Sequence, residues 1–106
     1  MKTTKNIPEL YKAILSLQNG NECQKFFRDL LTEAEIKEFA NRWKVARMLE
    51  DKTQYEIIAK ETGMSSTTIA RVNKWLHNGM GGYKLMIKHL AAKQNINHHH
   101  TSLTAV

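Results

Sequence analysis

Apolar side chains recur every three or four residues along most of the chain. This spacing places them on one face of an amphipathic α-helix, and no long run alternates with the period of two that a half-buried strand shows. The pattern therefore predicts an all-α protein. The clearest repeats are Ile7, Leu10, Tyr11, Ile14 and Leu15, then Cys23, Phe26, Phe27, Leu30 and Leu31, and later Tyr83, Met86, Ile87, Leu90 and Ala91.

Capping signals divide this pattern into six helices. Thr32–Glu35 and Thr53–Glu56 each match the capping box, in which a hydroxyl and a carboxylate accept from orphan backbone donors, and Asn21–Gln24 is a weaker version. Ser65 can cap the helix that follows it, and Pro8 is acceptable only in a first turn. The predicted helices span roughly residues 6–18, 22–30, 33–50, 54–62, 66–78 and 82–93.

The length of 106 residues is typical of one domain. We assign residues 1–94 to a single helical domain and expect residues 95–106 to form a flexible tail, because the chain is polar and then irregular there. The run His98–His100 lacks the i, i+3 or i, i+4 spacing of histidines that share a metal on a helix. No metal site is predicted.

Composition narrows the functional classes. The 16 Lys and Arg exceed the 10 Asp and Glu, and the net charge of +6 suits a polyanionic partner, although a solvated basic surface has the same composition. No apolar run is long enough for a membrane span or follows the N-terminus as in a signal peptide, so we expect a cytoplasmic protein. No catalytic triad order, P-loop or dinucleotide fingerprint is present, so neither enzyme activity nor a cofactor is predicted. The single Cys23 is expected to be a buried apolar residue.

The segment 33–50 carries apolar residues on more than one face. A helix with two apolar faces needs cover on two sides, which a second copy of the chain supplies most simply. The alternative is a central helix inside a monomer core. We favour a homodimer, because the chain has a large apolar inventory for short helices. The residues of the two faces are Ile36, Phe39, Ala40 and Trp43, and then Val45, Ala46, Met48 and Leu49.

The segment from Thr53 to Leu76 is typical of a helix-turn-helix, about residues 53–76. Ala59 is small enough for the close crossing of two helices, and Gly63 tolerates the positive φ of the turn. Ile69 points from the second helix back to the first. The rest of the predicted small core is Ile57, Ile58, Val72 and Leu76. An ordinary αα-hairpin shares the need for a small residue and a glycine.

The opposite face of the second helix is predicted to enter the major groove of DNA. At about 100° per residue, this face points away from Ile69. Hydroxyls can bond base edges or phosphates, Ala70 suits a thymine methyl, and Arg71 can grip guanine or phosphate. The predicted DNA-binding residues are Ser65, Ser66, Thr67, Thr68, Ala70, Arg71 and Lys74, with Gln54, Lys60 and Lys52 as backbone anchors near the first helix.

A set of residues between positions 31 and 71 matches the pattern of one known family. These residues are Leu31, Thr32 and Glu35, Asn41 and Arg42, Thr53, Gln54, Glu56 and Ile57, Gly63, and Thr67, Thr68, Ile69 and Arg71. On them the chain resembles the Trp repressor family, and more narrowly its Trp-repressor-like branch of regulators in low-GC Gram-positive bacteria. The resemblance implies six helices, an intertwined homodimer and two helix-turn-helix heads that read a palindrome about one DNA turn, ~34 Å, apart.

The family's tryptophan pocket carries over only in part. Thr32, Arg42 and Arg71 match residues that hold the ligand. Val72 stands where the family has a glycine that makes room for the indole, and Trp75 stands where it has a serine that holds the amino group. These two larger side chains would fill the space, so the resemblance implies a vestigial pocket and DNA binding without tryptophan.

Together these observations predict a sequence-specific, DNA-binding transcriptional regulator that acts as a dimeric repressor on a palindromic operator. Two other functions remain open: an all-α module that binds an acidic protein, and a DNA-binding subunit in replication or transposition.

Overall fold

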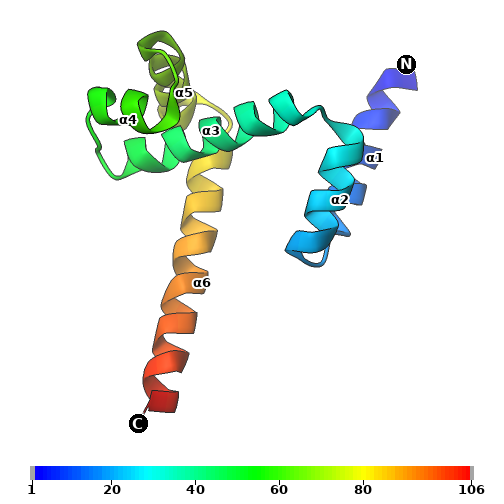
Figure 1. The fold of residues 1–106 in the computed structure, drawn as a ribbon. Coiled ribbons are helices and arrows are strands. Elements are labelled where there is room, and N and C mark those ends of the chain that lie inside the picture. Colours follow the sequence, from blue (N-terminus) through cyan, green and yellow to red (C-terminus); the bar gives the residue numbers. More distant parts are fainter. Residues whose placement is uncertain (1, 106) are drawn as a thin grey trace. The chain divides into compact units, whose positions relative to one another are not determined.

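The computed structural model describes the backbone of residues 2–105 and the side chains of residues 5–94. Within this part of the chain there are six helices and no strand, so the predicted all-α class is confirmed. The helices are α1 Lys2–Leu15, α2 Gly20–Leu30, α3 Glu33–Glu50, α4 Tyr55–Thr62, α5 Ser66–Asn78 and α6 Gly82–Ala105 (Figure 1). The chain divides into two compact units, residues 1–38 and 39–106.

The first unit contains α1, α2 and the start of α3. Helix α1 begins at Lys2, so the prediction that Pro8 marks a first turn is wrong. A proline removes only one backbone donor, and the helix continues through it. Helix α2 begins at Gly20 rather than 22, because the Asn19 side chain already accepts a hydrogen bond from the Glu22 backbone N–H at 2.9 Å. Asn19, not Asn21, is the N-cap.

The capping box at the start of α3 is confirmed. The Glu35 N–H donates to Thr32 Oγ1 at 3.1 Å, and the Thr32 N–H donates to the Glu35 carboxylate at 2.9 Å. The hydrogen bond from the Thr32 backbone, followed by that of its side chain, lowers the pKa of Glu35. The reciprocal bonds therefore stabilise the ionised carboxylate and hold the first turn of α3.

The second predicted capping box, Thr53–Glu56, is wrong. Lys52 adopts a left-handed conformation with φ of 61°, and the N–H groups of Lys52 and Thr53 donate to Leu49 and Met48 at 3.0 and 2.9 Å. This is the Schellman arrangement that ends a helix. Since Thr53 belongs to the end of α3, α4 starts at Tyr55 with Gln54 as a cap that makes no side-chain hydrogen bond.

The core of the second unit lies where α3, α4 and α5 meet. Val45, Ala46, Ile58, Ile69 and Val72 are fully buried and form one cluster. The burial of Ile69 and Val72 follows the predicted apolar face of α5, and the cluster accounts for the packing of α4 on α5. Partly buried residues surround the cluster, namely Trp43, Met48, Leu49, Ala59, Met64 and Tyr83.

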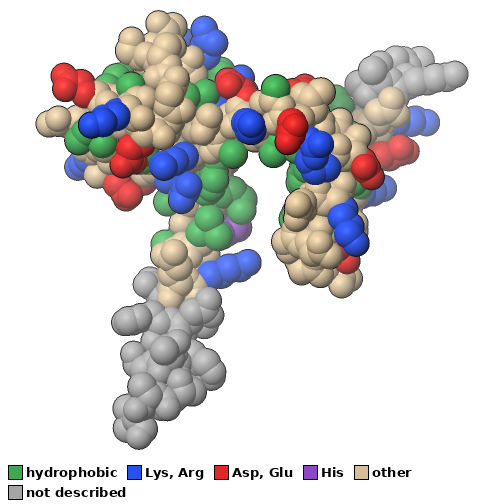
Figure 2. All heavy atoms as spheres, in the orientation of Figure 1, with side chains coloured by type: hydrophobic (Ala, Val, Ile, Leu, Met, Phe, Trp, Pro, Cys, Tyr) green, Lys and Arg blue, Asp and Glu red, His purple; other side chains and the backbone are tan. Residues whose placement is uncertain are grey.

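Helix α6 leaves α5 at the Gly79–Gly82 connection and packs against it near its own start. It runs to Ala105, well past the predicted end near residue 93. The helix bounds do not test the flexibility expected for residues 95–106, which stays a prediction, and the side chains of His98–His100 lie outside the described residues. Leu85, Met86 and Leu90 on the first half of α6 are exposed, and Figure 2 shows hydrophobic side chains gathered there.

Candidate nucleic-acid interface

The turn between α4 and α5 has the geometry of a helix-turn-helix. Gly63 ends α4 in the left-handed conformation, with φ of 72° and ψ of 7°, and its N–H donates to the Ala59 carbonyl at 2.8 Å. A Cβ at Gly63 would meet nothing within 4 Å, so the backbone conformation rather than space requires glycine there. Ser65 then starts α5, as predicted, by accepting a hydrogen bond from the Thr68 N–H at 3.2 Å.

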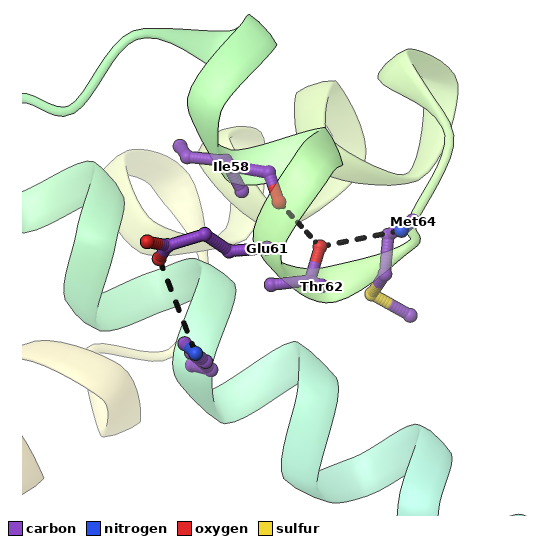
Figure 3. Close-up of polar contacts among 5 residues, drawn as sticks. Ile58, Glu61, Thr62 and Met64 are labelled. Atoms are coloured by element: carbon purple, nitrogen blue, oxygen red, sulfur yellow. Dashed lines mark hydrogen bonds and ion pairs between the residues drawn. The ribbon is translucent and has the colours of Figure 1, made fainter.

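Thr62 fixes this turn from inside, although none of the sequence patterns described above points to this residue. Its hydroxyl donates to the Ile58 carbonyl at 2.7 Å and accepts from the Met64 N–H at 3.2 Å (Figure 3). The side chain is buried, with 9% of its surface exposed. Its position four residues after Ile58, on the buried face of α4, is the signal that could have identified it.

An ion pair adds a second link between α4 and α3. The Lys44 ammonium lies 4.0 Å from the Glu61 carboxylate, which Figure 3 shows beside Thr62. Both side chains are about half exposed, at 44% and 51%, so solvent screens the attraction. The orientation of α4 is therefore set mainly by the buried cluster, while the Thr62 hydroxyl bonds within α4 and the turn that follows it.

Helix α5 separates a buried face from an exposed face, as predicted. Ile69 and Val72 are 0% exposed and Leu76 is 2% exposed. The predicted groove-facing residues Ser66, Thr67, Ala70, Arg71 and Lys74 are all exposed. The helix therefore presents one exposed face that carries two cations, Arg71 and Lys74.

The remaining predicted contacts lie at the start of α5 and along α4. The Ser65 hydroxyl donates to Thr68 Oγ1 at 3.1 Å while it caps α5, so these two side chains already have a structural role. Gln54 at the N-cap of α4 and Lys60 near its end are exposed. Of the two α4 isoleucines expected in the small core, only Ile58 is buried, and the prediction for Ile57, which is 47% exposed, is wrong.

The residues of the carried-over tryptophan pocket fall in both units. Thr32 belongs to the first unit, where its hydroxyl is part of the capping box. In the second unit, the Arg42 guanidinium lies 5.9 Å from the centre of the Phe39 ring, Arg71 is exposed, and Val72 is fully buried in the core. Trp75 is 40% exposed and lines an apolar cavity.

The fold and the exposed face of α5 place the chain in the class of helix-turn-helix proteins. Comparison with known proteins assigns the family. The family model described as Trp repressor protein matches residues 5–91. The "Uncharacterized protein YerC" of Bacillus subtilis (strain 168) is 42% identical over 83 residues, which are 78% of this chain and 80% of that protein.

Solved structures agree with this assignment. The crystal structure of a TrpR-like protein from Eubacterium eligens has a TM-score of 0.80 and 39% identity, covering 82% of this chain and 90% of that one. A proposed Trp repressor from Staphylococcus aureus has a TM-score of 0.79 and 37% identity, covering 82% and 87%. The chain belongs to the Trp repressor family, and this membership indicates a DNA-binding regulator. Among the described residues, no helix is long and apolar enough to cross a membrane.

Proposed function

We propose that this protein is a sequence-specific transcriptional repressor that binds a palindromic operator as a homodimer. The observation that carries the proposal is the exposed face of α5, which lies opposite the buried Ile69, Val72 and Leu76 on a helix capped at both ends. A helix held in this way can enter the major groove without reordering its backbone. The proposed repressor acts in the cytoplasm by blocking access to a promoter.

Each side chain on this face has a distinct role in the proposed complex. Ser66 and Thr67 lie in the first turn of α5 and bond base edges or phosphates. Ala70 contacts a thymine methyl, and Arg71 bonds guanine at two positions. Lys74 and Lys60 each neutralise a phosphate. Gln54, at the start of α4, bonds the DNA backbone. With only two cations on α5, water completes part of the base reading.

Exposed apolar side chains support the proposed homodimer. In the first unit, Ile7, Tyr11 and Leu15 are 52%, 59% and 83% exposed. In the second unit, Leu85 and Leu90 on α6 are 51% and 43% exposed. Apolar side chains exposed in this way mark association sites, and a twofold partner would cover the same residues on both copies.

The proposed repressor binds DNA without tryptophan. Val72 is fully buried in the core, so the position that holds a ligand-accommodating glycine in the family is filled by a packed side chain. Trp75 replaces the serine that would hold the amino group. An isothermal titration with L-tryptophan should therefore give no saturable heat, and saturable uptake would refute this part of the proposal.

A gel-shift salt titration tests the proposed function. Affinity for a selected site should exceed that for random DNA and fall steeply with salt, because phosphate contacts release counterions. Arg71→Ala should weaken specific binding by about 1–3 kcal/mol and relax the sequence preference. Arg28→Ala, an exposed arginine on α2, is the matched control and should leave binding unchanged. Equal binding by all three proteins, or none by the parent, would contradict the proposal and favour a protein-interaction module.

A further inference from the structure

Charge is distributed unevenly along the chain. Residues 1–61 hold 11 Lys and Arg together with all 10 Asp and Glu, whereas residues 62–106 hold five Lys and Arg and no acidic residue. Nearly all of the net charge of +6 therefore comes from the second segment. This segment contains α5 and α6, which pack against each other. The excess of positive charge is thus concentrated on two neighbouring helices of the second unit.

The lysines at the start of α6 have no acidic neighbour on their helix. Lys84 and Lys88 are exposed and lie one turn apart, and none of the residues three or four positions from either is acidic. Neither forms an ion pair with a carboxylate of the described residues. Because like charges at this spacing repel each other, the pair slightly destabilises the helix unless an anion lies beside it.

The lysines of the first unit have the opposite arrangement. Lys25 lies three residues after Glu22 and four before Asp29, and Lys37 lies four residues after Glu33. An acidic side chain at such a position offsets the charge of the lysine on the same helix face. The uncompensated cations of α6 are therefore a local feature and not a general property of the surface.

Lys84 and Lys88 do not belong to the apolar face of α6. At about 100° per residue, they lie about 120–160° around the helix from Met86 and Leu90, which are exposed on that face. A second copy seated on the apolar face need not cover either ammonium group. The two lysines are for this reason free to bind another partner in the proposed dimer.

We propose that Lys84 and Lys88 bind phosphates of the same DNA duplex that α5 reads. A duplex carries one negative charge per ~1.7 Å of its axis, and each phosphate that a lysine neutralises releases counterions. An acidic protein also attracts cations, but Arg71 and Lys74, the proposed DNA contacts of α5, belong to the same acid-free segment. DNA as the partner rests on the proposed function. The two lysines add affinity for every sequence and read no base.

Fluorescence anisotropy with labelled duplexes tests this proposal on the full chain. The double variant Lys84→Gln/Lys88→Gln keeps the helix, because glutamine and lysine have similar helix propensities. Its affinity for the selected site and for random DNA should fall by the same factor, about tenfold at low salt. The slope of log affinity against log salt should become shallower by about 1 for each lysine. The preference for the selected site should stay unchanged, in contrast to Arg71→Ala.

A second double variant separates contact from overall charge. Lys25→Gln/Lys37→Gln removes the same two charges from exposed positions with acidic neighbours and should keep the affinity and the salt slope of the parent. Equal losses in both double variants, or none in the α6 variant, would overturn the proposal, and the second result would favour an acidic protein as the partner.

The same titrations distinguish failure of this inference from failure of the proposed function. A parent that binds selected and random DNA equally, together with an α6 variant that loses affinity for both, would leave the phosphate contacts standing without the sequence-specific repressor. A parent that prefers the selected site, together with an α6 variant that behaves like the parent, would leave the repressor standing without these contacts.

Discussion

The helix-turn-helix and the N-terminal helices differ in how far their apolar residues are buried. Ile58, Ile69 and Val72 are 0% exposed in the second unit, whereas Tyr11 and Leu15 on α1 remain 59% and 83% exposed. Helix α2 has a similar amphipathic pattern and contains no buried residue. A single chain therefore buries the core residues that position α5, but it leaves the apolar face of its N-terminal helices exposed.

This difference separates what each region needs. The turn between α4 and α5 has its own core, caps and buried hydroxyl, so its geometry is defined within one protomer. The N-terminal helices carry apolar surface that is costly in water, and burial against a second copy would stabilise them. In the proposed repressor, the helix-turn-helix reads DNA, and the N-terminal helices set the spacing between the two helix-turn-helices of the dimer.

The largest expected effect is a loss of stability on changing the buried core of the helix-turn-helix. Ile69→Ala removes a fully buried side chain and should lower the free energy of unfolding by about 2–5 kcal/mol. Ile57→Ala is a matched control, because Ile57 is 47% exposed on α4, and it should cost much less. Urea unfolding measures both, and equal costs would contradict the core as described.

An intermediate effect, on dimer association, is expected from a change on the exposed apolar face of α1. Tyr11→Lys places a charge on the apolar face of α1 and should weaken the proposed dimer by about tenfold or more, because a desolvated ammonium group opposes association. Lys12→Gln, an exposed position next to it, should not change the association. Sedimentation equilibrium over a range of concentrations gives the dissociation constants. A Tyr11→Lys protein with the parent constant would remove α1 from the interface.

The smallest effect concerns the hydroxyl inside the turn. Thr62→Val keeps the shape of the side chain but removes the acceptor of the Met64 N–H, and should cost about 1–3 kcal/mol of stability. Thr62→Ser keeps the hydroxyl and should cost less. Thermal unfolding, together with the affinity for the selected DNA site, compares the two. If valine were as stable as serine, the hydrogen bonds of Thr62 would not hold the turn.

Much of this architecture could be predicted from the sequence, because local signals decide it. Apolar spacing predicted six helices, and Gly63 and Ser65 marked the turn with residues whose backbone and hydrogen-bonding needs are specific. Predictions failed where two local signals competed. Thr53 fits a capping box, but the left-handed Lys52 uses the Thr53 N–H to end α3.

Features that depend on side chains from distant segments could not be read from spacing. Ile57 and Ile58 are adjacent and equally apolar, and only the packing of α4 on its neighbours decides that Ile58 is buried. The stack of Trp43 on Tyr83 joins residues forty positions apart on α3 and α6. The cavity beside Trp75 is for this reason a finding of the structure.

Selection of bound sequences from random DNA, without added tryptophan, tests the central claim most directly. Two α5 helices held by one dimer should enrich a single palindrome whose half-sites lie about one helical turn, ~34 Å, apart. Arg71→Ala should lose the preference for one base pair in each half-site. A pool that shows no enriched sequence, or a motif without twofold symmetry, would contradict the account of a dimeric, sequence-reading repressor.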